Sequence, residues 1–459
     1  MRSAGQRLMA TVRRRLVTRD RSWLAGGVSA AALAAWVAVS ASCSALRDTV
    51  SPPAHVAMYS VEPEVRVRVR RSATTAQVDG PSKLVVRPAG GGRSRLLSSP
   101  VSVRSGIGGL TFSDGREKVE MGFGVNAEVV AYDAASGGTP ASAGARSLLR
   151  VDGVEQPGFA SFQARSEEGP DKFDVVVAMP VEDYLPGVIV KEMYTYWPKE
   201  AFAMQAVCAR TYALHERDRA RVGGKLFDVE ASTLDQAYSG ATTILAARDA
   251  VKDTRGVVLT DHGKLLRAYY SSCCGGRPAA AADVWPTGPG FEFNRAAPLQ
   301  GKSREFACEP SPLFRWEVTR SEDDLSQRLR AWGRSAGNPV KTMGRLRGVE
   351  MERASASGRP ARYRVTDDKG KTFSLSAEEL RVACNQNADG LAPITRETRV
   401  NSGDLAIDVR GAVVKISGRG FGHGVGMCQW CAKGMADKGQ NWRHMAELFY
   451  PGVEVVRVY

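Results

Sequence analysis

The chain has 459 residues, of which 43% are hydrophobic, so it can bury at least one large core and is too apolar to be disordered throughout. It contains 63 Lys and Arg against 49 Asp and Glu, a formal net charge of +14. A basic chain first suggests nucleic acid or an anionic surface as its partner. The basic residues are dispersed rather than gathered with aromatic residues in one patch, which argues against nucleic acid.

Residues 1–45 predict a signal peptide or a membrane anchor. They contain seven Arg and one Asp, a charge of +6, which leaves +8 for the rest of the chain. An uncharged apolar run from Trp23 to Ser42 follows the arginines and is roughly long enough to span a bilayer as a helix. Positive flanks stay cytoplasmic, so we expect the remainder to be exported to the cell envelope, with membrane contact only through this segment. Cys43 could carry a lipid, but Ser40 stands where a lipoprotein cleavage box has an aliphatic residue, so a small residue near a cleavage site is the favoured interpretation.

Residues 62–175 are expected to be mainly β. From Glu64 to Arg70 valine alternates with arginine, the period of a half-buried strand whose charged residues face out. Short apolar runs follow at Leu84 to Val86, Val129 to Tyr132 and Phe173 to Ala178, separated by Gly, Ser and Pro clusters. No helix of useful length is predicted before about residue 183.

Residues 176–459 are expected to form a mixed core, with an inserted hairpin-rich subdomain at about residues 308–395. A helix is predicted from Pro198 to Gly223-Gly224. In the insertion, Ser321 to Trp332 predicts a short amphipathic helix, and Ser355 to Leu375 predicts a hairpin. The expected fold class is therefore α+β.

Within the segment from Val181 to Met193, a short helix with a carboxylate on its apolar face is predicted, with Pro186 near its start. If Pro186 occupies the first helical turn, one face carries Leu185, Val188, Ile189 and Glu192 at i, i+3, i+4 and i+7. Burial disfavours the ionised form, so Glu192 would have a raised pKa and could donate a proton near neutral pH. The alternatives are that Glu192 is a buried partner of Arg210, or that it points to water at the helix end.

A glycine-rich segment, Gly418 to Met427, has glycine at alternate positions. Glycine removes side chains, so this backbone and His423 can approach a neighbouring group closely; the alternative is a tight glycine hairpin without a ligand. The segment is not a phosphate loop, because no Gly-Lys-Ser/Thr follows it.

Eight cysteines occur, and seven of them follow the leader: Cys208, Cys273, Cys274, Cys308, Cys384, Cys428 and Cys431. An exported chain can form disulfides. Cys428 and Cys431 form a C-x-x-C motif that could be half of a zinc site or a redox pair, but no second half-site has zinc-finger spacing and no redox-domain strand pattern surrounds it. Structural disulfides or buried thiols are therefore favoured, and no metal or cofactor is predicted.

Eight blocks together resemble one known family. They are Glu182 to Val188, Glu192-Met193, Trp197-Pro198, Gln205 to Ala213, Gln236 to Gly240, Ala250 to Gly256, Tyr270 to Gly276 and Gly420 to Gln429. In this order they resemble the stage II sporulation protein D family, also called amidase enhancer proteins. The resemblance covers residues 181–459, and the β-rich stretch from about residue 62 resembles the family's N-terminal part.

The resemblance implies a function and a site. Members of the family include peptidoglycan lytic transglycosylases, which break the β-1,4 bond between N-acetylmuramic acid and N-acetylglucosamine, and their essential acid corresponds to Glu192. The blocks contain six residues that the resemblance makes candidates for glycan binding: Arg210, Gln236, Tyr238, Ser272, His423 and Gln429. Tyr194, Tyr196 and Trp197 could stack on sugar faces or simply pack. The expected partner is the peptidoglycan glycan strand. The alternative is a noncatalytic protein that binds peptidoglycan and stimulates an N-acetylmuramoyl-L-alanine amidase of the cell wall.

The chain also departs from the family pattern at its metal and cysteine positions. Some members bind structural zinc through Cys and His in the block before Gln236, where this chain has Glu230 and Asp235, so that site is predicted to be absent. Cys273, Cys274, Cys428 and Cys431 occupy positions where many members have Ser, Gly or Tyr. They lie in or just after the two glycine-rich blocks, Tyr270 to Gly276 and Gly420 to Gln429. A disulfide that joins the two blocks is the preferred hypothesis.

Overall fold

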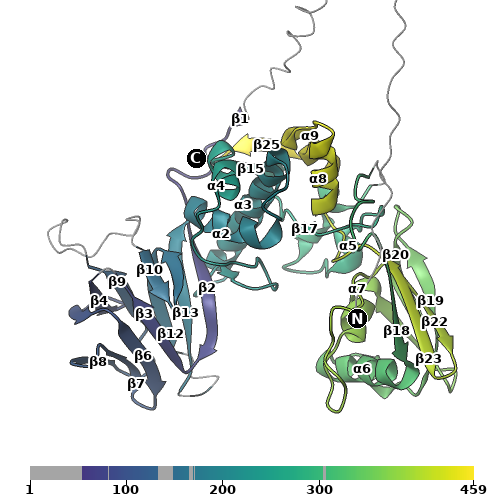
Figure 1. Cartoon of the computed structure of the whole chain (residues 1–459), viewed down its shortest axis with the longest axis horizontal. Helices are drawn as coiled ribbons and strands as arrows, with labels where there is room; N and C mark the ends of the chain where they lie inside the picture. The colour runs from purple at the N-terminus through teal and green to yellow at the C-terminus, as the bar shows by residue number, and fades with distance from the viewer. Residues whose placement is uncertain (1–53, 81, 133–147, 165–168, 170, 303–305) are drawn as a thin grey trace, which may run out of the picture. The chain divides into compact units, whose positions relative to one another are not determined.

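The computed structural model of the chain describes residues 54–80, 82–132, 148–164, 169, 171–302 and 306–459. The predicted signal peptide or anchor, residues 1–45, lies outside this range. Within the described ranges, no helix has both the length and the apolar character that crossing a membrane requires. The fold is α+β, as predicted, with a β-rich N-terminal part and several smaller sheets (Figure 1).

Two sheets form the N-terminal part. The seven-stranded sheet has the order β14 (Val229–Glu230), β2 (Glu64–Ala73), β13 (Phe173–Pro180), β12 (Phe159–Ala164), β9 (Ala127–Ala131), β4 (Lys83–Pro88) and β5 (Arg95–Ser98). The six-stranded sheet has the order β11 (Val154–Pro157), β10 (Leu148–Val151), β3 (Thr75–Asp79), β6 (Val101–Gly106), β7 (Gly109–Ser113) and β8 (Lys118–Met121). The two sheets share one hydrophobic core, in which Phe112 packs edge-on against Phe162 with ring centroids 5.4 Å apart.

The predicted alternating strand is present as β2, but its arginines do not all face solvent. Arg68 is buried and forms ion pairs with Asp174 and Glu230. Arg66 forms an ion pair with Asp228 at 2.6 Å. The expectation that the charges of this strand face out is therefore wrong for Arg68, because β2 lies between β13 and β14 and acidic residues of neighbouring segments neutralise it, whereas Arg70 is exposed as expected.

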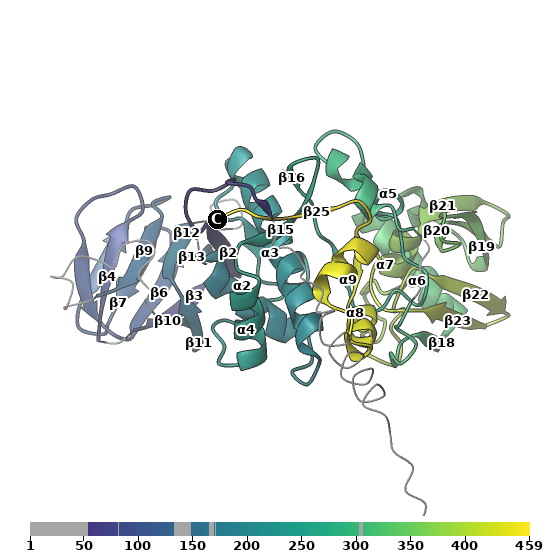
Figure 2. The same cartoon turned by 90° about the horizontal axis from the view of Figure 1, so that it is seen from above.

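A long helix, α3 (Lys199–Val222), organises the mixed core. It contacts α2 (Val181–Glu192), α4 (Leu245–Asp253), α8 (Gln429–Asp437), α9 (Trp442–Phe449) and β15 (Val257–Asp261) (Figure 2). Pro198 and Gly223 cap its two ends, which confirms the helix predicted between them. Elements from the two ends of the core sequence therefore meet on one helix.

The helix α2 follows β13 directly, and in the described part of the chain no helix precedes it. Its N-cap is Pro180, so Pro186 lies in the second turn and the expected start of the helix is wrong. The predicted apolar face is confirmed, because the side chains of Leu185, Val188 and Ile189 are fully buried. Glu192 is the last residue of this helix.

The remaining elements of the mixed core are short. One sheet has the order β1 (Ala54–His55), β25 (Glu454–Arg457), β15 and β16 (Lys264–Leu265). The strands β17 (Tyr270–Ser271) and β24 (Met427–Cys428) pair in parallel and join the two blocks that the sequence singled out. The short helices α5 (Ala281–Val284), η3 (Glu292–Arg295) and η4 (Ala297–Leu299) follow β17.

A second hydrophobic core is built from residues between Trp316 and Ile416. Two sheets enclose it, with the orders β18 (Arg315–Ser321), β23 (Val413–Arg419), β22 (Leu405–Arg410) and β19 (Leu346–Ala354), β20 (Pro360–Asp367), β21 (Thr372–Ser376). The helices are α6 (Glu322–Ser335), η5 (Pro339–Thr342) and α7 (Ala377–Cys384). The predicted helix and hairpin are confirmed as α6 and the β20–β21 pair. The strands β22 and β23, which follow residue 395, also contribute to this core.

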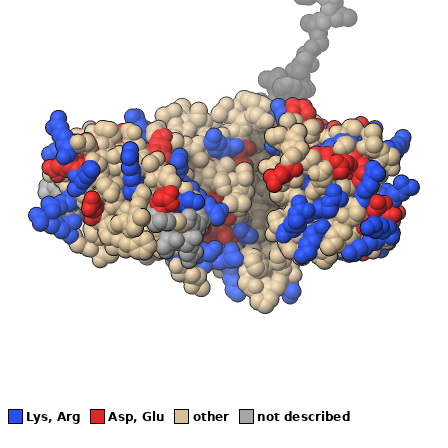
Figure 3. Space-filling view, turned by 90° about the horizontal axis from the view of Figure 1, so that it is seen from below, with Lys and Arg blue, Asp and Glu red and all other residues tan. Residues whose placement is uncertain are grey.

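On the face drawn in Figure 3, Lys and Arg lie among Asp, Glu and uncharged residues. Many of the basic residues are in ion pairs, such as Arg87 with Glu128 and Arg353 with Asp283.

Candidate active site

The carboxyl group of Glu192 is half-buried at the C-terminal end of α2. Burial raises its pKa, and a hydrogen bond from Gln429 opposes part of this increase. The Nε2 of Gln429 donates to Oε2 of Glu192 at 3.2 Å. No Lys or Arg of the described ranges forms an ion pair with Glu192. A carboxyl group in these surroundings can hold a proton at a higher pH than an exposed one, as expected from the sequence.

Gln429 begins α8 and is almost completely buried. Its Nε2 also donates to Oε1 of Gln205 on α3 at 3.2 Å, so α3 and α2 both contact the first residue of α8. The parallel pairing of β17 with β24 places this residue, because Ser271 is the register partner of Cys428. Gln205 lies in a block that the sequence singled out, but it was not among the predicted site residues.

Arg210 pairs with Glu182 and not with Glu192. Its guanidinium group donates to both carboxylate oxygens of Glu182, at 2.9 and 2.7 Å, and has no exposed surface. Burial alone would raise the pKa of Glu182, but Arg210 and hydrogen bonds from Tyr459 and Gly256 lower it on balance. The alternative in which Glu192 is a buried partner of Arg210 is therefore wrong. Arg210 lies inside the core, where it joins α3 to α2.

Gln236 is buried beside two tyrosines that connect it to the surroundings of Glu192. It accepts a hydrogen bond from Tyr184 at 3.3 Å and donates to the hydroxyl of Tyr270 at 3.1 Å. Burial, and then the charge of Glu192, raise the pKa of Tyr270. Tyr238 is half-buried, and its ring packs against Tyr184 with centroids 5.1 Å apart.

His423 faces a different set of residues. Its ring lies 4.9 Å from that of Trp285, and it lines a small cavity with Arg359 and Glu378. Burial lowers its pKa to about 4, so it is neutral at pH 7. Ser272 is half-buried, and its backbone carbonyl accepts a hydrogen bond from the N–H of Trp430 at 3.0 Å. Of the six predicted binding residues, Gln429 is the one with a direct hydrogen bond to Glu192 among the contacts of the described residues.

An aromatic cluster combines three residues that follow Glu192 closely in the chain with one that follows Gln429. It consists of Tyr194, Tyr196, Trp197 and Trp430. Tyr194 and Tyr196 are 56% and 73% exposed, and the rings of Trp197 and Trp430 are 5.1 Å apart. Trp430 was not among the residues predicted from the sequence, although its position directly after Gln429 was a usable signal. Exposed aromatic rings beside a proton donor can stack on the faces of a sugar.

The cysteines of the described residues are free thiols. The expected disulfide between the glycine-rich blocks is therefore not found, although Cys274 and Cys431 bring their Sγ atoms within 3.9 Å. Cys208 and Cys384 are buried away from that contact, in the main core and the second core respectively.

Comparisons with known proteins match two separate regions. The family model described as "Stage II sporulation protein" matches residues 170–260, which include α2, α3 and Glu192. A domain of unknown function, DUF8618, matches residues 294–426, which include the second hydrophobic core.

Three relatives illustrate the similarity. An uncharacterized protein of Brachyspira hyodysenteriae is 29% identical, over 62% of this chain and 69% of its own length. The amidase enhancer of Bacillus subtilis is 28% identical over 58% of this chain, but the match spans 39% of that longer protein. Stage II sporulation protein D of Bacillus subtilis is 25% identical over 60% of this chain and 74% of its own length. Together with the match over residues 170–260, these similarities support the resemblance to the stage II sporulation protein D and amidase enhancer family that the sequence blocks predicted.

Proposed function

We propose that this chain is an exported lytic transglycosylase that cleaves peptidoglycan glycan strands with Glu192 as its single acid and base. The observation that carries the proposal is the environment of Glu192, which is half-buried, has a raised pKa and is hydrogen-bonded to a neutral amide rather than to a cation. A protonated carboxyl group is what departure of a glycosidic oxygen requires.

The reaction needs one carboxyl group. Glu192 gives its proton to the glycosidic oxygen as the bond from that oxygen to C1 of N-acetylmuramic acid breaks. The C6 hydroxyl oxygen of the same sugar then attacks C1, and its proton passes to the Glu192 carboxylate. The products are a 1,6-anhydro end and a free 4-hydroxyl on N-acetylglucosamine. No water is consumed, and Glu192 returns to its protonated form, so the second carboxylate of ordinary glycosidases is unnecessary.

Other residues serve this chemistry in different ways. Gln429 orients the carboxyl group of Glu192, and the exposed rings of Tyr194 and Tyr196 offer surfaces for sugar rings. The remaining candidates for glycan contacts are Gln236, Tyr238, Ser272 and His423. Arg210 acts as a positioning residue, because its buried ion pair holds the first turn of α2 against α3.

The direct test compares wild type with Glu192→Gln on glycan strands stripped of peptide. Mass spectrometry of the soluble products is expected to show anhydro-ended fragments with the wild type and at least a hundredfold fewer with Glu192→Gln, since the amide cannot donate the proton. Glu447→Gln changes an exposed glutamate on α9 and serves as the matched control, with unchanged product formation. Absence of anhydro ends with folded wild-type protein on both stripped and intact peptidoglycan would show that the chain is not a transglycosylase.

A noncatalytic role is the second candidate, and the similarity to the Bacillus subtilis amidase enhancer supports it. In that case the chain would bind peptidoglycan and stimulate a cell-wall amidase. The same two variants separate the roles: Glu192→Gln would stimulate amidase release of stem peptides as well as wild type if enhancement is independent of catalysis.

A further inference from the structure

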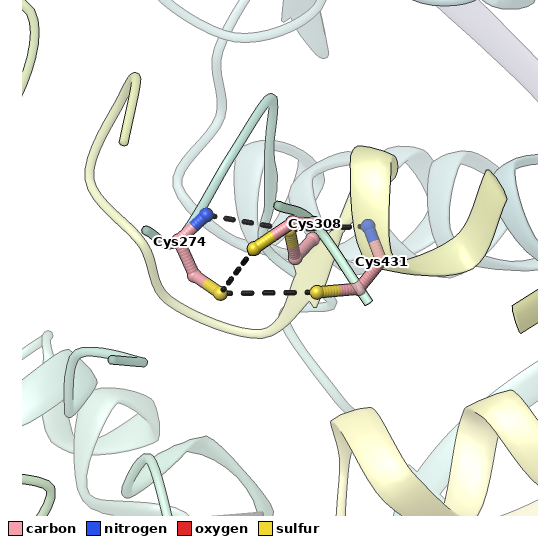
Figure 4. Close-up of side chains that lie close together, drawn as sticks. Cys274, Cys308 and Cys431 are labelled. Carbon is pink, nitrogen blue, oxygen red and sulfur yellow. Dashed lines mark hydrogen bonds between the residues drawn. The ribbon is translucent and has the colours of Figure 1, made fainter. Parts of the chain in front are cut away.

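Four cysteine thiols from separate segments of the chain meet at one buried point. Cys274 follows β17, Cys308 precedes β18, and Cys428 and Cys431 lie at the start of α8. The four Sγ atoms all lie within 4.8 Å of one another. The Sγ of Cys274 is 3.7 Å from that of Cys308 and 3.9 Å from that of Cys431, and Figure 4 shows these sulfur atoms pointing toward one another.

The spacing is that of ligands around a single ion. A tetrahedral ion with zinc–sulfur bonds of about 2.3 Å places its four sulfur atoms about 3.8 Å apart. Sulfur atoms in a disulfide are joined at about 2.05 Å, far closer than these thiols. Ligands of a polynuclear iron–sulfur cluster lie further apart, because several iron atoms separate them.

We infer that Cys274, Cys308, Cys428 and Cys431 form a closed, four-coordinate structural zinc site. Four thiolates are a ligand set that tetrahedral Zn²⁺ takes in structural sites. Zinc holds cysteines as thiolates, which explains how four adjacent thiols persist in a chain expected to be exported to a compartment that permits disulfides.

The surroundings of the thiols are suited to bound thiolates. Backbone N–H groups of Cys274 and Cys431 donate to Sγ of Cys428 at 3.3 and 3.4 Å, and such hydrogen bonds stabilise negative charge on sulfur. The buried guanidinium group of Arg359 donates to the carbonyl of Cys274 at 3.1 Å, which places a positive charge near a centre with a net charge of about −2. After Cys274 the chain turns at Gly275, whose φ is +66° and whose added Cβ would lie 2.7 Å from the Cβ of Arg419.

The site joins the start of α8, which carries Gln429, to the segment that leads into the second hydrophobic core. Gln429, which donates to Glu192, lies between Cys428 and Cys431, so the ion would hold the start of α8 in place. Cys308 connects the segment that leads into the second hydrophobic core to the glycine-rich blocks. This consequence rests on the proposed function, whereas zinc binding itself does not.

The test measures metal in the full chain. Protein made with zinc and reductant, and then desalted, is expected to contain one zinc per chain by inductively coupled plasma mass spectrometry. The double variant Cys274→Ser/Cys431→Ser is expected to lose at least nine-tenths of it. Cys208→Ser and Cys384→Ser change buried cysteines outside the cluster and are expected to keep a full equivalent.

A measurement on the wild type does not depend on whether the variants fold. Titration with an organomercurial reagent is expected to modify four thiols and to release the zinc in proportion. A chromogenic chelator measures the zinc that is released. Cobalt substitution is expected to give the visible bands of tetrahedral thiolate coordination. Three results would overturn the inference. Wild-type protein could lack stoichiometric zinc, peptide mapping could find these cysteines as disulfides, or iron and sulfide could be bound in place of zinc. Glu192→Gln is expected to keep its zinc, so failure of the proposed function and failure of the zinc site give different results.

Discussion

The protonation state of Glu192 is determined by two opposing contacts. Burial disfavours the carboxylate and raises the pKa, while the hydrogen bond from Gln429 stabilises the carboxylate and lowers it. Because the proposed mechanism starts from the protonated acid, activity is expected to fall as the pH rises through this raised pKa. The amide of Gln429 therefore controls both the position and the acidity of the group.

Replacing Gln429 by Leu is expected to shift the alkaline limb of the pH profile upward. Loss of one hydrogen bond to an ionised group is worth about 1.5–3 kcal/mol, so the pKa of Glu192 should rise by about 1–2 units. The measurement is kcat/KM for anhydro-end formation against pH. Gln327→Leu changes a glutamine on α6 that bonds Asp323 and serves as the control with an unshifted profile. A profile that does not move in Gln429→Leu would mean that this contact is not made in solution.

At the scale of elements, α2 is held to α3 by the buried pair of Glu182 and Arg210. Arg210 also donates to the carbonyls of Val251 and Val257, so one side chain connects α3 with the C-terminal half of α4 and the start of β15. Removing a charge from such a pair leaves the other charge buried without compensation. The orientation of the helix that ends in Glu192 depends on this contact.

Arg210→Met is expected to lower the free energy of unfolding by about 3–5 kcal/mol, as measured by urea denaturation at pH 7. Arg410→Met removes an exposed arginine that pairs with Asp408 and should cost less than about 1 kcal/mol. The pKa of Glu182 is lowered in the folded protein, so the stabilisation from this pair is present above the unfolded pKa of about 4.3 and is lost as the pH falls through the folded pKa. The difference between wild type and Arg210→Met should therefore shrink below about pH 4. A difference that is independent of pH would contradict this assignment.

Gly187 lies inside α2 where the loop at residues 238–240 crosses the helix. A Cβ at this position would lie 2.3 Å from the carbonyl oxygen of Gly240 and 2.5 Å from the ring of Tyr238. Helix propensity alone predicts that Gly187→Ala stabilises by about 0.5–1 kcal/mol. The contact predicts instead a loss of about 1–3 kcal/mol, measured as a lower Tm. Gly348→Ala, on β19 with open space around its Cα, is the control and should change the Tm little.

At the scale of the whole molecule, the described part of the chain contains two hydrophobic cores. The first includes the N-terminal sheets and the helices around Glu192, and the second is built from residues between Trp316 and Ile416. A region with its own core can unfold as a unit of its own. The zinc site inferred above would connect the two regions through Cys308.

Calorimetry of the full chain is expected to show two unfolding transitions. Leu329→Ala and Leu185→Ala each remove a fully buried leucine, one from the second core and one from the first, and each should cost about 2–5 kcal/mol. Each variant should lower mainly the transition of its own core. The contrary result is a single transition whose calorimetric and van't Hoff enthalpies agree and whose temperature is lowered by either variant. It would show that the cores unfold together.

The distribution of charge also belongs to this scale. Of the net charge of +14, residues 1–45 carry +6, so cleavage of a leader would leave a chain of about +8. On the face drawn in Figure 3, groups of basic residues lie at several places among acidic and uncharged ones. Such a surface favours weak, salt-dependent attraction to an anionic polymer over tight binding at one basic patch.

The sequence by itself was sufficient for features that depend on near neighbours in the chain. The period of two in β2, the caps of α3, the β20–β21 hairpin and the apolar face that ends in Glu192 all follow from short stretches of the chain. Side-chain direction and backbone preference are local properties, so periodicity reports them. Pro186 misled the prediction of the start of α2, because α2 continues without a break from β13.

Only the tertiary structure decided which distant groups meet. Gln429 reaches Glu192 across 237 positions, Arg210 pairs with Glu182 rather than Glu192, and Cys308 joins three cysteines of the glycine-rich blocks. A sequence shows that a carboxylate or a thiol will be buried, but burial alone does not select its partner. That choice depends on how the helices and sheets pack, and here α3 and the β17–β24 pair bring the partners together.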